Sequence, residues 1–151
     1  MHFRILAVCA VLPFFPGAGT GLAHDGAMGA TKERMDAMSD MGRALKALHI
    51  AMRSGDLLDA PDAPLLIEQL RQKGQILPSL FATNEIPEMS DASPHIWDDP
   101  EGFGAKIDAF NTGVEELVDA HENRNRAEAG AALRKVTAGC SNCHQAYRTS
   151  N

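Results

Sequence analysis

Apolar residues recur along most of this chain at alternating steps of three and four, the spacing that places them on one face of an α-helix. The pattern predicts four helices, which cover about residues 31–54, 62–81, 100–121 and 126–148. Short connections join the first pair and the last pair, so the helices of each pair are expected to run antiparallel. The chain is therefore predicted to be all-α, an antiparallel up-down-up-down four-helix bundle.

The apolar stripes also predict which side chains form the core. In the first two helices they comprise Met38, Met41, Leu45, Leu48, Met52, Leu66, Leu70, Leu77 and Leu80. In the last two they comprise Phe103, Ile107, Phe110, Val114, Leu117, His121, Ala129, Leu133, Val136, Cys140, Cys143 and Tyr147. Pro78 interrupts the second helix, where a kink or an end is expected because proline removes a backbone hydrogen bond. Residues 82–99 are expected to form a long connection.

The N-terminus has the features of a secretory signal peptide. Arg4 supplies a positive charge, residues 5–15 are largely apolar, and residues 21–23 offer a small-residue cleavage site. The apolar run is shorter than a membrane span, so stable membrane insertion is not expected. We therefore assign residues 1–23 to a signal peptide and residues 24–151 to one bundle domain.

The charge of the chain limits its partners. Its 14 basic and 20 acidic side chains give a net charge of −6, which becomes −7 when Arg4 is removed with the signal peptide. Nucleic acid is excluded as a partner because phosphate binding needs a basic surface. The acidic surface permits a basic protein partner. Paired carboxylates and nucleophile–base constellations do not stand out, so the protein is not expected to be an enzyme.

The chemistry-bearing motif is Cys140-Ser141-Asn142-Cys143-His144, a C-x-x-C-H sequence. This spacing is the attachment signature of a c-type haem. The two thiols form thioether bonds to the porphyrin, and the histidine is an axial ligand of the iron. Because Cys140 and Cys143 fall in phase with the core stripe, one covalent haem c is expected on the inward face of the fourth helix.

Three other interpretations of the cysteine pair are weaker. A thioredoxin-like dithiol usually accompanies a βαβ pattern, and no strand-like alternation precedes Cys140. A structural zinc site needs four ligands, whereas Cys9 is the one further cysteine in the sequence. A disulfide between Cys140 and Cys143 would close a very small loop and constrain little of the unfolded chain.

The bundle topology restricts where a sixth iron ligand can come from. The C-terminal end of the fourth helix should meet the N-terminal end of the first helix, where Met35, Met38 and Met41 lie. Met38 and Met41 belong to the inward stripe and Met35 lies at its edge, so geometry alone leaves these three open, with a small lead for Met38. Among the histidines, His95 in the long connection is a further candidate at this end. His49 and His121 are too far from this end, and His24 precedes the helices. His49 lies roughly 16 Å along the helix from Met38.

With C-x-x-C-H near the C-terminus of a four-helix bundle, the chain resembles the class II cytochromes c. Met38-Ser39-Asp40-Met41-Gly42-Arg43 is similar to the M-x-D-x-G-R pattern of the low-spin cytochrome c-556 branch, whose leading methionine is the sixth ligand. Residues 77–81 and 93–97 resemble other segments of that branch, although His95 stands where lysine is frequent. The resemblance implies that Met38 and His144 are the axial ligands of the haem iron.

The resemblance also implies a function and an alternative. The first is a periplasmic c-type cytochrome that transfers electrons to redox partner proteins through a low-spin His/Met haem. The alternative is a high-spin cytochrome c′, whose vacant distal site binds NO or CO. The family includes monomers and homodimers, and both states remain open. Four side chains are secondary candidates for contact with the haem: Arg34, Trp97, Tyr147 and Arg148.

Overall fold

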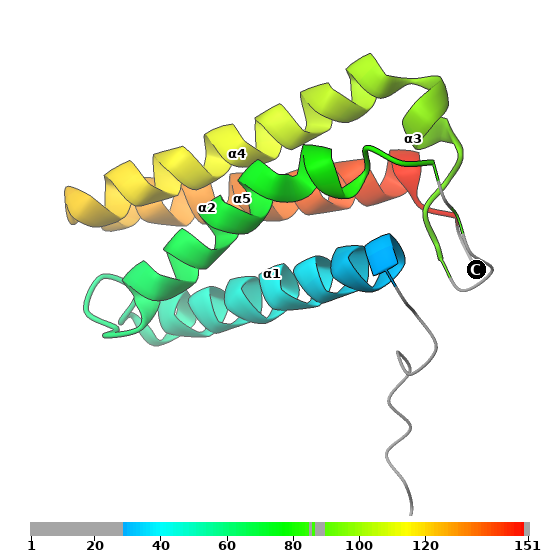
Figure 1. Cartoon of the computed structure of the whole chain (residues 1–151). Helices are drawn as coiled ribbons and strands as arrows, with labels where there is room; N and C mark the ends of the chain where they lie inside the picture. The colour runs from blue at the N-terminus through cyan, green and yellow to red at the C-terminus, as the bar shows by residue number, and fades with distance from the viewer. Residues whose placement is uncertain (1–28, 85, 87–89, 150–151) are drawn as a thin grey trace, which may run out of the picture.

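The computed structural model describes residues 29–84, 86 and 90–149. Within them the chain forms α1 (Gly29–Ser54), α2 (Ala63–Leu80), α3 (His95–Asp98), α4 (Pro100–Glu122) and α5 (Arg126–Tyr147) (Figure 1). The four long helices form the predicted antiparallel four-helix bundle. The predicted signal peptide, residues 1–23, lies outside the described residues.

Local sequence signals explain the helix ends. Asp99 caps α4 because its carboxylate accepts a hydrogen bond from the backbone N–H of Gly102 at 3.0 Å, and Asn125 caps α5 in the same way through Glu128. Asp62 precedes α2, and its side chain makes no capping hydrogen bond. After α1, Gly55 has a φ of +92°, a conformation that favours glycine.

The described part of the region between the two helix pairs contains a short helix that the sequence pattern did not predict. α2 continues through Pro78 and ends two residues later at Leu80, close to the predicted bound at residue 81. The predicted connection 82–99 contains the short helix α3, whose Ile96 is buried against the core. Sequence periodicity missed α3 because four residues are too few to show a helical repeat.

The core contains most of the predicted stripe residues, and α2 shows one error. Leu70 and Leu77 are buried as predicted, whereas Leu66 and Leu80 are only partly buried. The buried face of α2 is formed by Ala63, Ile67, Leu70, Gly74 and Leu77. The pattern misplaced this face because Leu65, Leu66 and Ile67 are adjacent apolar residues, and their order does not say which one turns inward.

Gly74 explains why α2 turns this face toward α4. A β-carbon at Gly74 would lie 2.1 Å from the side-chain oxygen of Asn111 and 2.8 Å from the ring of Phe110. Both distances are shorter than van der Waals contact, so only glycine permits this close approach of α2 to α4.

None of the helices in the described part of the chain is long and apolar enough to cross a membrane.

Gly74→Ala is expected to destabilise the protein by about 1–3 kcal/mol, because the added methyl group must push α2 and α4 apart. The better helix propensity of alanine offsets up to about 1 kcal/mol of this cost. Urea denaturation followed by circular dichroism measures the difference.

Gly42→Ala is the matched control for this substitution. Gly42 lies in α1, and a β-carbon there meets no atom within 4 Å. Its alanine variant should therefore be as stable as the wild type or more stable. Equal stabilities of the Gly74→Ala and Gly42→Ala variants would contradict the tight contact between α2 and α4.

Candidate haem site

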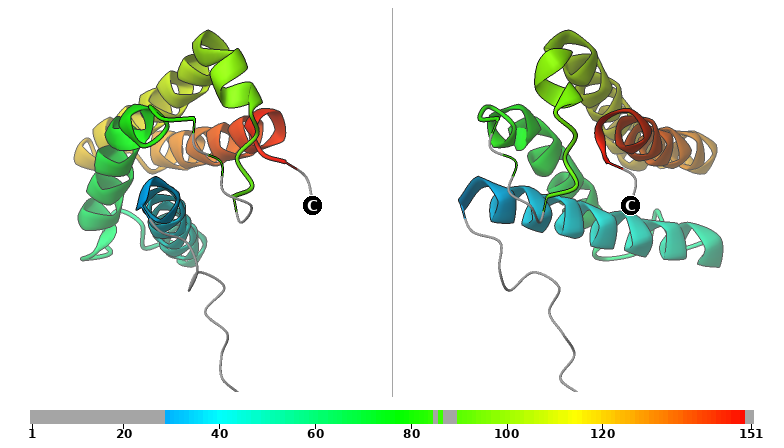
Figure 2. Two further views of the ribbon diagram at one scale, coloured as in Figure 1. Left: turned by 45° about the vertical axis from the view of Figure 1, so that its right-hand side comes forward. Right: turned by 90° about the vertical axis from the view of Figure 1, so that its right-hand side faces the viewer.

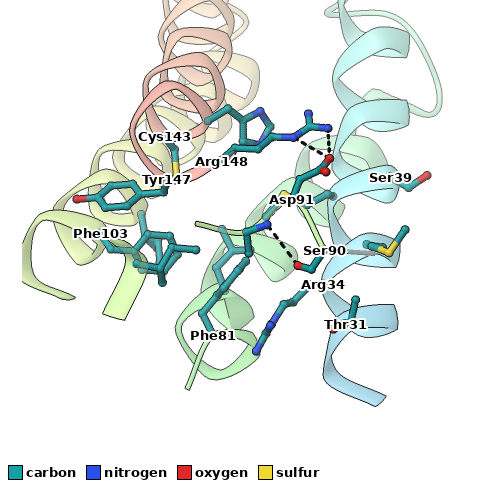
Figure 3. Close-up of a pocket in the computed structure, with 17 residues that line it drawn as sticks. Thr31, Arg34, Ser39, Phe81, Ser90, Asp91, Phe103, Cys143, Tyr147 and Arg148 are labelled. Carbon is teal, nitrogen blue, oxygen red and sulfur yellow. Dashed lines mark hydrogen bonds and ion pairs between the residues drawn. The ribbon is translucent and has the colours of Figure 1, made fainter. Parts of the chain in front are cut away.

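A cavity of about 480 Å³ lies at one end of the bundle, between the first turns of α1 and the end of α5 (Figure 3). Met35 and Met38 line it from α1, and Cys143 and His144 line it from α5. The volume is typical of cofactor sites, which measure roughly 300–1,000 Å³. The C-terminal end of the last helix thus meets the N-terminal end of the first, as the sequence predicted, and Figure 2 shows this end of the bundle.

Apolar side chains form much of the cavity wall. They come from α2, α3, α4 and the segment after α2, and they comprise Leu77, Phe81, Ile96, Phe103 and Ile107. The rings of Phe81 and Phe103 meet edge to face, with centroids 5.1 Å apart. Such a wall suits the flat apolar surface of a porphyrin.

The structure separates the candidate sixth ligands into two groups. Met38 and Met35 line the cavity, whereas Met41 is 6% exposed and belongs to the core cluster outside it. His95 does not line the cavity. His49 bonds to the hydroxyl of Thr137 on α5 at 2.8 Å. His121 is at the opposite end of α4. His24 lies outside the described residues.

Cys140 and Cys143 are both free thiols and both pack against the core, in agreement with their predicted phase on α5. Burial raises the pKa of each thiol, so both are protonated at neutral pH. Cys143 lines the cavity, and Cys140 lies one turn earlier on the same side of α5. Two reduced thiols on successive turns are the chemistry that thioether attachment requires.

His144 follows Cys143 at the cavity. Partial burial, and secondarily the positive charge of Arg148, lower the pKa of His144. The imidazole is therefore neutral at neutral pH and keeps a lone pair for a metal ion. These donors fit a covalent haem.

Arg34 ties α1 to the end of α2 beside the cavity. It is 4% exposed, and its guanidinium donates hydrogen bonds to the carbonyl oxygens of Leu80 at 2.6 Å and Thr83 at 2.8 Å. The same group lies 4.9 Å from the ring centre of Phe81 and 5.7 Å from that of Trp97. Trp97 thus packs on Arg34 and does not line the cavity.

The chain end closes another side of the cavity. Asp91 forms an ion pair with Arg148, and its carbonyl oxygen accepts the backbone N–H of Thr149 at 2.8 Å. The backbone N–H of Ser93 donates to the carbonyl oxygen of Tyr147 at 3.0 Å. Figure 3 shows Asp91 and Arg148 side by side at the cavity. Sequence reasoning missed Asp91 because nothing local marks its distant partner.

An ion pair holds the α1 segment that carries Met38. Asp40 lies 2.8 Å from the ammonium group of Lys73 on α2, and it also pairs with Arg43. The hydrogen bond from Lys73 is the main cause that lowers the pKa of Asp40. The aspartate of the M-x-D-x-G-R pattern therefore connects α1 to α2, and the arginine pairs with this aspartate within α1.

Comparisons with known proteins agree with this geometry. The cytochrome c′ family profile matches residues 29–148. Cytochrome c-556 of Agrobacterium tumefaciens is 26% identical over 120 residues, which cover 80% of this chain and 97% of that protein. Cytochrome c′ of Alcaligenes xylosoxydans is 28% identical over 119 residues, or 79% of this chain and 92% of the relative.

A solved structure gives the same result. It is a nitric oxide complex of a cytochrome c prime variant from Alcaligenes xylosoxidans. Its TM-score is 0.73 at 26% identity, and the match covers 81% of this chain and 94% of that one.

The bundle and these matches define a helical c-type cytochrome. The chain belongs to the cytochrome c′ family. Its cofactor is a covalent c-type haem, and its role is electron transfer or gas binding.

Asp40→Asn is expected to lower the free energy of unfolding by about 0.5–1 kcal/mol at neutral pH, because Lys73 loses its charged partner. The folded-state pKa of Asp40 is below its ordinary value of 3.8. The stabilisation is therefore complete above that value and is lost as the pH falls through the lower, folded-state pKa. Urea denaturation at neutral pH and below pH 3.8 measures this change.

Asp36→Asn is the control, since Asp36 pairs with Lys32 on the exposed surface of α1. Its substitution should change stability little at either pH. An effect of Asp40→Asn that is the same at both pH values would contradict the proposed tie.

Proposed function

We propose that this protein is a periplasmic electron carrier with one low-spin haem c. Cys140 and Cys143 would hold the porphyrin, and His144 and Met38 would bind the iron from opposite sides. The observation that carries this proposal is the cavity that Met38 of α1 and His144 of α5 line together, beside the two reduced thiols.

The bound haem would supply one-electron chemistry at its iron, and the protein residues would tune it. A neutral imidazole at His144 and a thioether at Met38 are ligands that both oxidation states of iron accept. A methionine ligand raises the reduction potential. Because the two ligands come from helices of one packed bundle, a change of oxidation state should need little rearrangement of the protein.

The cavity walls support a carrier in a further way. Apolar side chains from three helices, together with the Phe81 ring, would contact a bound porphyrin and shield part of it from water. A water-poor environment reduces the reorganisation that accompanies a change of iron charge. Filling of the sixth position by Met38 would also disfavour binding of small gases.

Gas binding is the alternative function, and a specific observation favours it. A structure similar to this chain is a nitric oxide complex of a cytochrome c prime variant. In that case Met38 and Met35 would line a vacant distal pocket without binding the iron. The two functions therefore differ in the role of one side chain.

The proposed location and partners rest on two features outside the cavity, the signal peptide and the net charge. A signal peptide at residues 1–23 would export the protein to the periplasm, where a covalent haem is attached in bacteria. The net charge of −6 for the full chain, which becomes −7 when Arg4 is removed with the signal peptide, favours redox partner proteins with a basic docking surface. A monomer and a homodimer are both compatible with this role.

Met38→Ala is expected to open the sixth coordination position and to convert the iron toward high spin. The reduced variant should then bind CO readily, whereas the wild type should bind it weakly. Optical spectra of both proteins, before and after addition of CO, measure the change. A haem stain on a denaturing gel shows that the haem remains covalently attached in the variant.

Met35→Ala and Met41→Ala are the matched controls. Met35 lines the same cavity and Met41 lies in the core. Because the proposal assigns the sixth position to Met38, neither control variant should alter the spin state. A normal spectrum for Met38→Ala beside an altered spectrum for either control would refute the assignment of Met38.

A further inference from the structure

Tyr147 lies on the last turn of α5, three residues after His144 and four after Cys143. Among residues 144–149 it has the one buried side chain, with 5% of its surface exposed. Residues 148 and 149 make exposed contacts, which are the ion pair of Arg148 with Asp91, a hydrogen bond from the Thr149 hydroxyl to the carbonyl oxygen of Asp91, and nearby backbone hydrogen bonds. Tyr147 is therefore the main packed anchor for the turn that carries the proposed axial histidine.

The ring of Tyr147 is held on two sides. Phe103 of α4 meets it edge to face, with centroids 5.2 Å apart. His95 of α3 stacks on it at the same centroid distance. The ring thus lies between α3 and α4 and also lines the cavity, as Figure 3 shows for Tyr147 and Phe103.

The hydroxyl of Tyr147 donates a hydrogen bond to a carboxylate oxygen of Asp99 at 2.7 Å. Asp99 is itself fixed, because its other carboxylate oxygen caps α4 through Gly102 and its backbone N–H bonds to the carbonyl of His95. The hydrogen bond raises the pKa of Tyr147 to about 12 and lowers that of Asp99. The pair is therefore a neutral phenol and a charged carboxylate at neutral pH, a strong form of hydrogen bond.

Gly102 shows that the fold leaves space for this contact. A β-carbon at Gly102 would lie 2.1 Å from a carboxylate oxygen of Asp99 and 2.6 Å from the hydroxyl oxygen of Tyr147. Any larger residue would displace one partner of the hydrogen bond. Gly104, two residues along the same helix, has no atom within 4 Å of such a carbon.

We propose that Tyr147 and Asp99 form a positioning pair that orients the turn of α5 carrying His144 and thereby sets the reduction potential of the haem iron. The proposal rests on the proposed function, because it needs His144 as an iron ligand. The pair connects the start of α4 to the end of α5. A substitution in the pair would therefore change the orientation of the His144 imidazole, although neither residue contacts the iron. Asp99 also places a negative charge near the site, and Tyr147 partly neutralises that charge through its hydroxyl.

Tyr147→Phe tests the proposal because it keeps the ring and removes only the hydroxyl. The carboxylate of Asp99 would then favour the oxidised, more positive iron. At a fixed ambient potential, the ratio of reduced to oxidised haem should fall on the order of threefold to tenfold, where tenfold equals about 59 mV for one electron. The electron paramagnetic resonance spectrum of the oxidised variant should also change, since it reports the orientation of the imidazole.

A double-mutant cycle with Asp99→Asn distinguishes a pair from two independent residues. If the pair acts as a unit, Tyr147→Phe should change the potential less in the Asp99→Asn background than in the wild type. Additive shifts in potential would overturn the proposal. A loss of thermal stability with no change in potential or resonance spectrum would also overturn it, because it would show a structural role alone.

Gly102→Ala and Gly104→Ala provide an independent comparison on one helix. Gly102→Ala should reproduce the shift in potential of Tyr147→Phe, and Gly104→Ala should leave the potential unchanged. The reverse result would overturn the proposal.

A haem stain of the wild-type protein on a denaturing gel separates the two levels of inference. Without covalent haem, both the proposed function and the positioning pair fail. If the wild type carries covalent haem and Tyr147→Phe leaves its potential unchanged, only the positioning pair fails.

Discussion

The antiparallel arrangement of α5 and α1 is the constraint on which the proposed function of this protein depends. The C-x-x-C-H motif occupies the end of α5, and the start of α1 lies across the cavity from it. Among the neighbouring long helices, α1 and α5 make the least extensive contact, and the cavity lies between them. The bundle is therefore open where a covalent haem would complete its core.

Polar ties surround this opening, where apolar packing is incomplete. Arg34 joins α1 to the end of α2, Asp40 joins α1 to Lys73, and Tyr147 joins α5 to the start of α4. These contacts hold the helix ends in place around a cavity that their own side chains do not fill. They would also help the proposed ligands from two helices to keep a defined separation through a change of oxidation state.

Much of the fold could be predicted from the sequence because each long helix has a clear apolar stripe. The orientation of α2 could not, since its buried face depends on the contact that Gly74 makes with α4. The motif residues of α5 were predictable because they are adjacent in sequence. Asp91 and Asp99 were not identified as site residues, since each acts through a partner far along the chain, although Asp99 before Pro100 is a helix-start signal. Of the three candidate methionines, Met38 and Met35 line the cavity and Met41 does not.

The most direct measurement of the central proposal is the optical spectrum of the purified holoprotein in its oxidised and reduced states. Axial ligation by His144 and Met38 predicts low-spin spectra in both states, with the weak long-wavelength band of methionine ligation in the oxidised form. A five-coordinate high-spin spectrum that changes readily with CO would contradict this account and would support the gas-binding function.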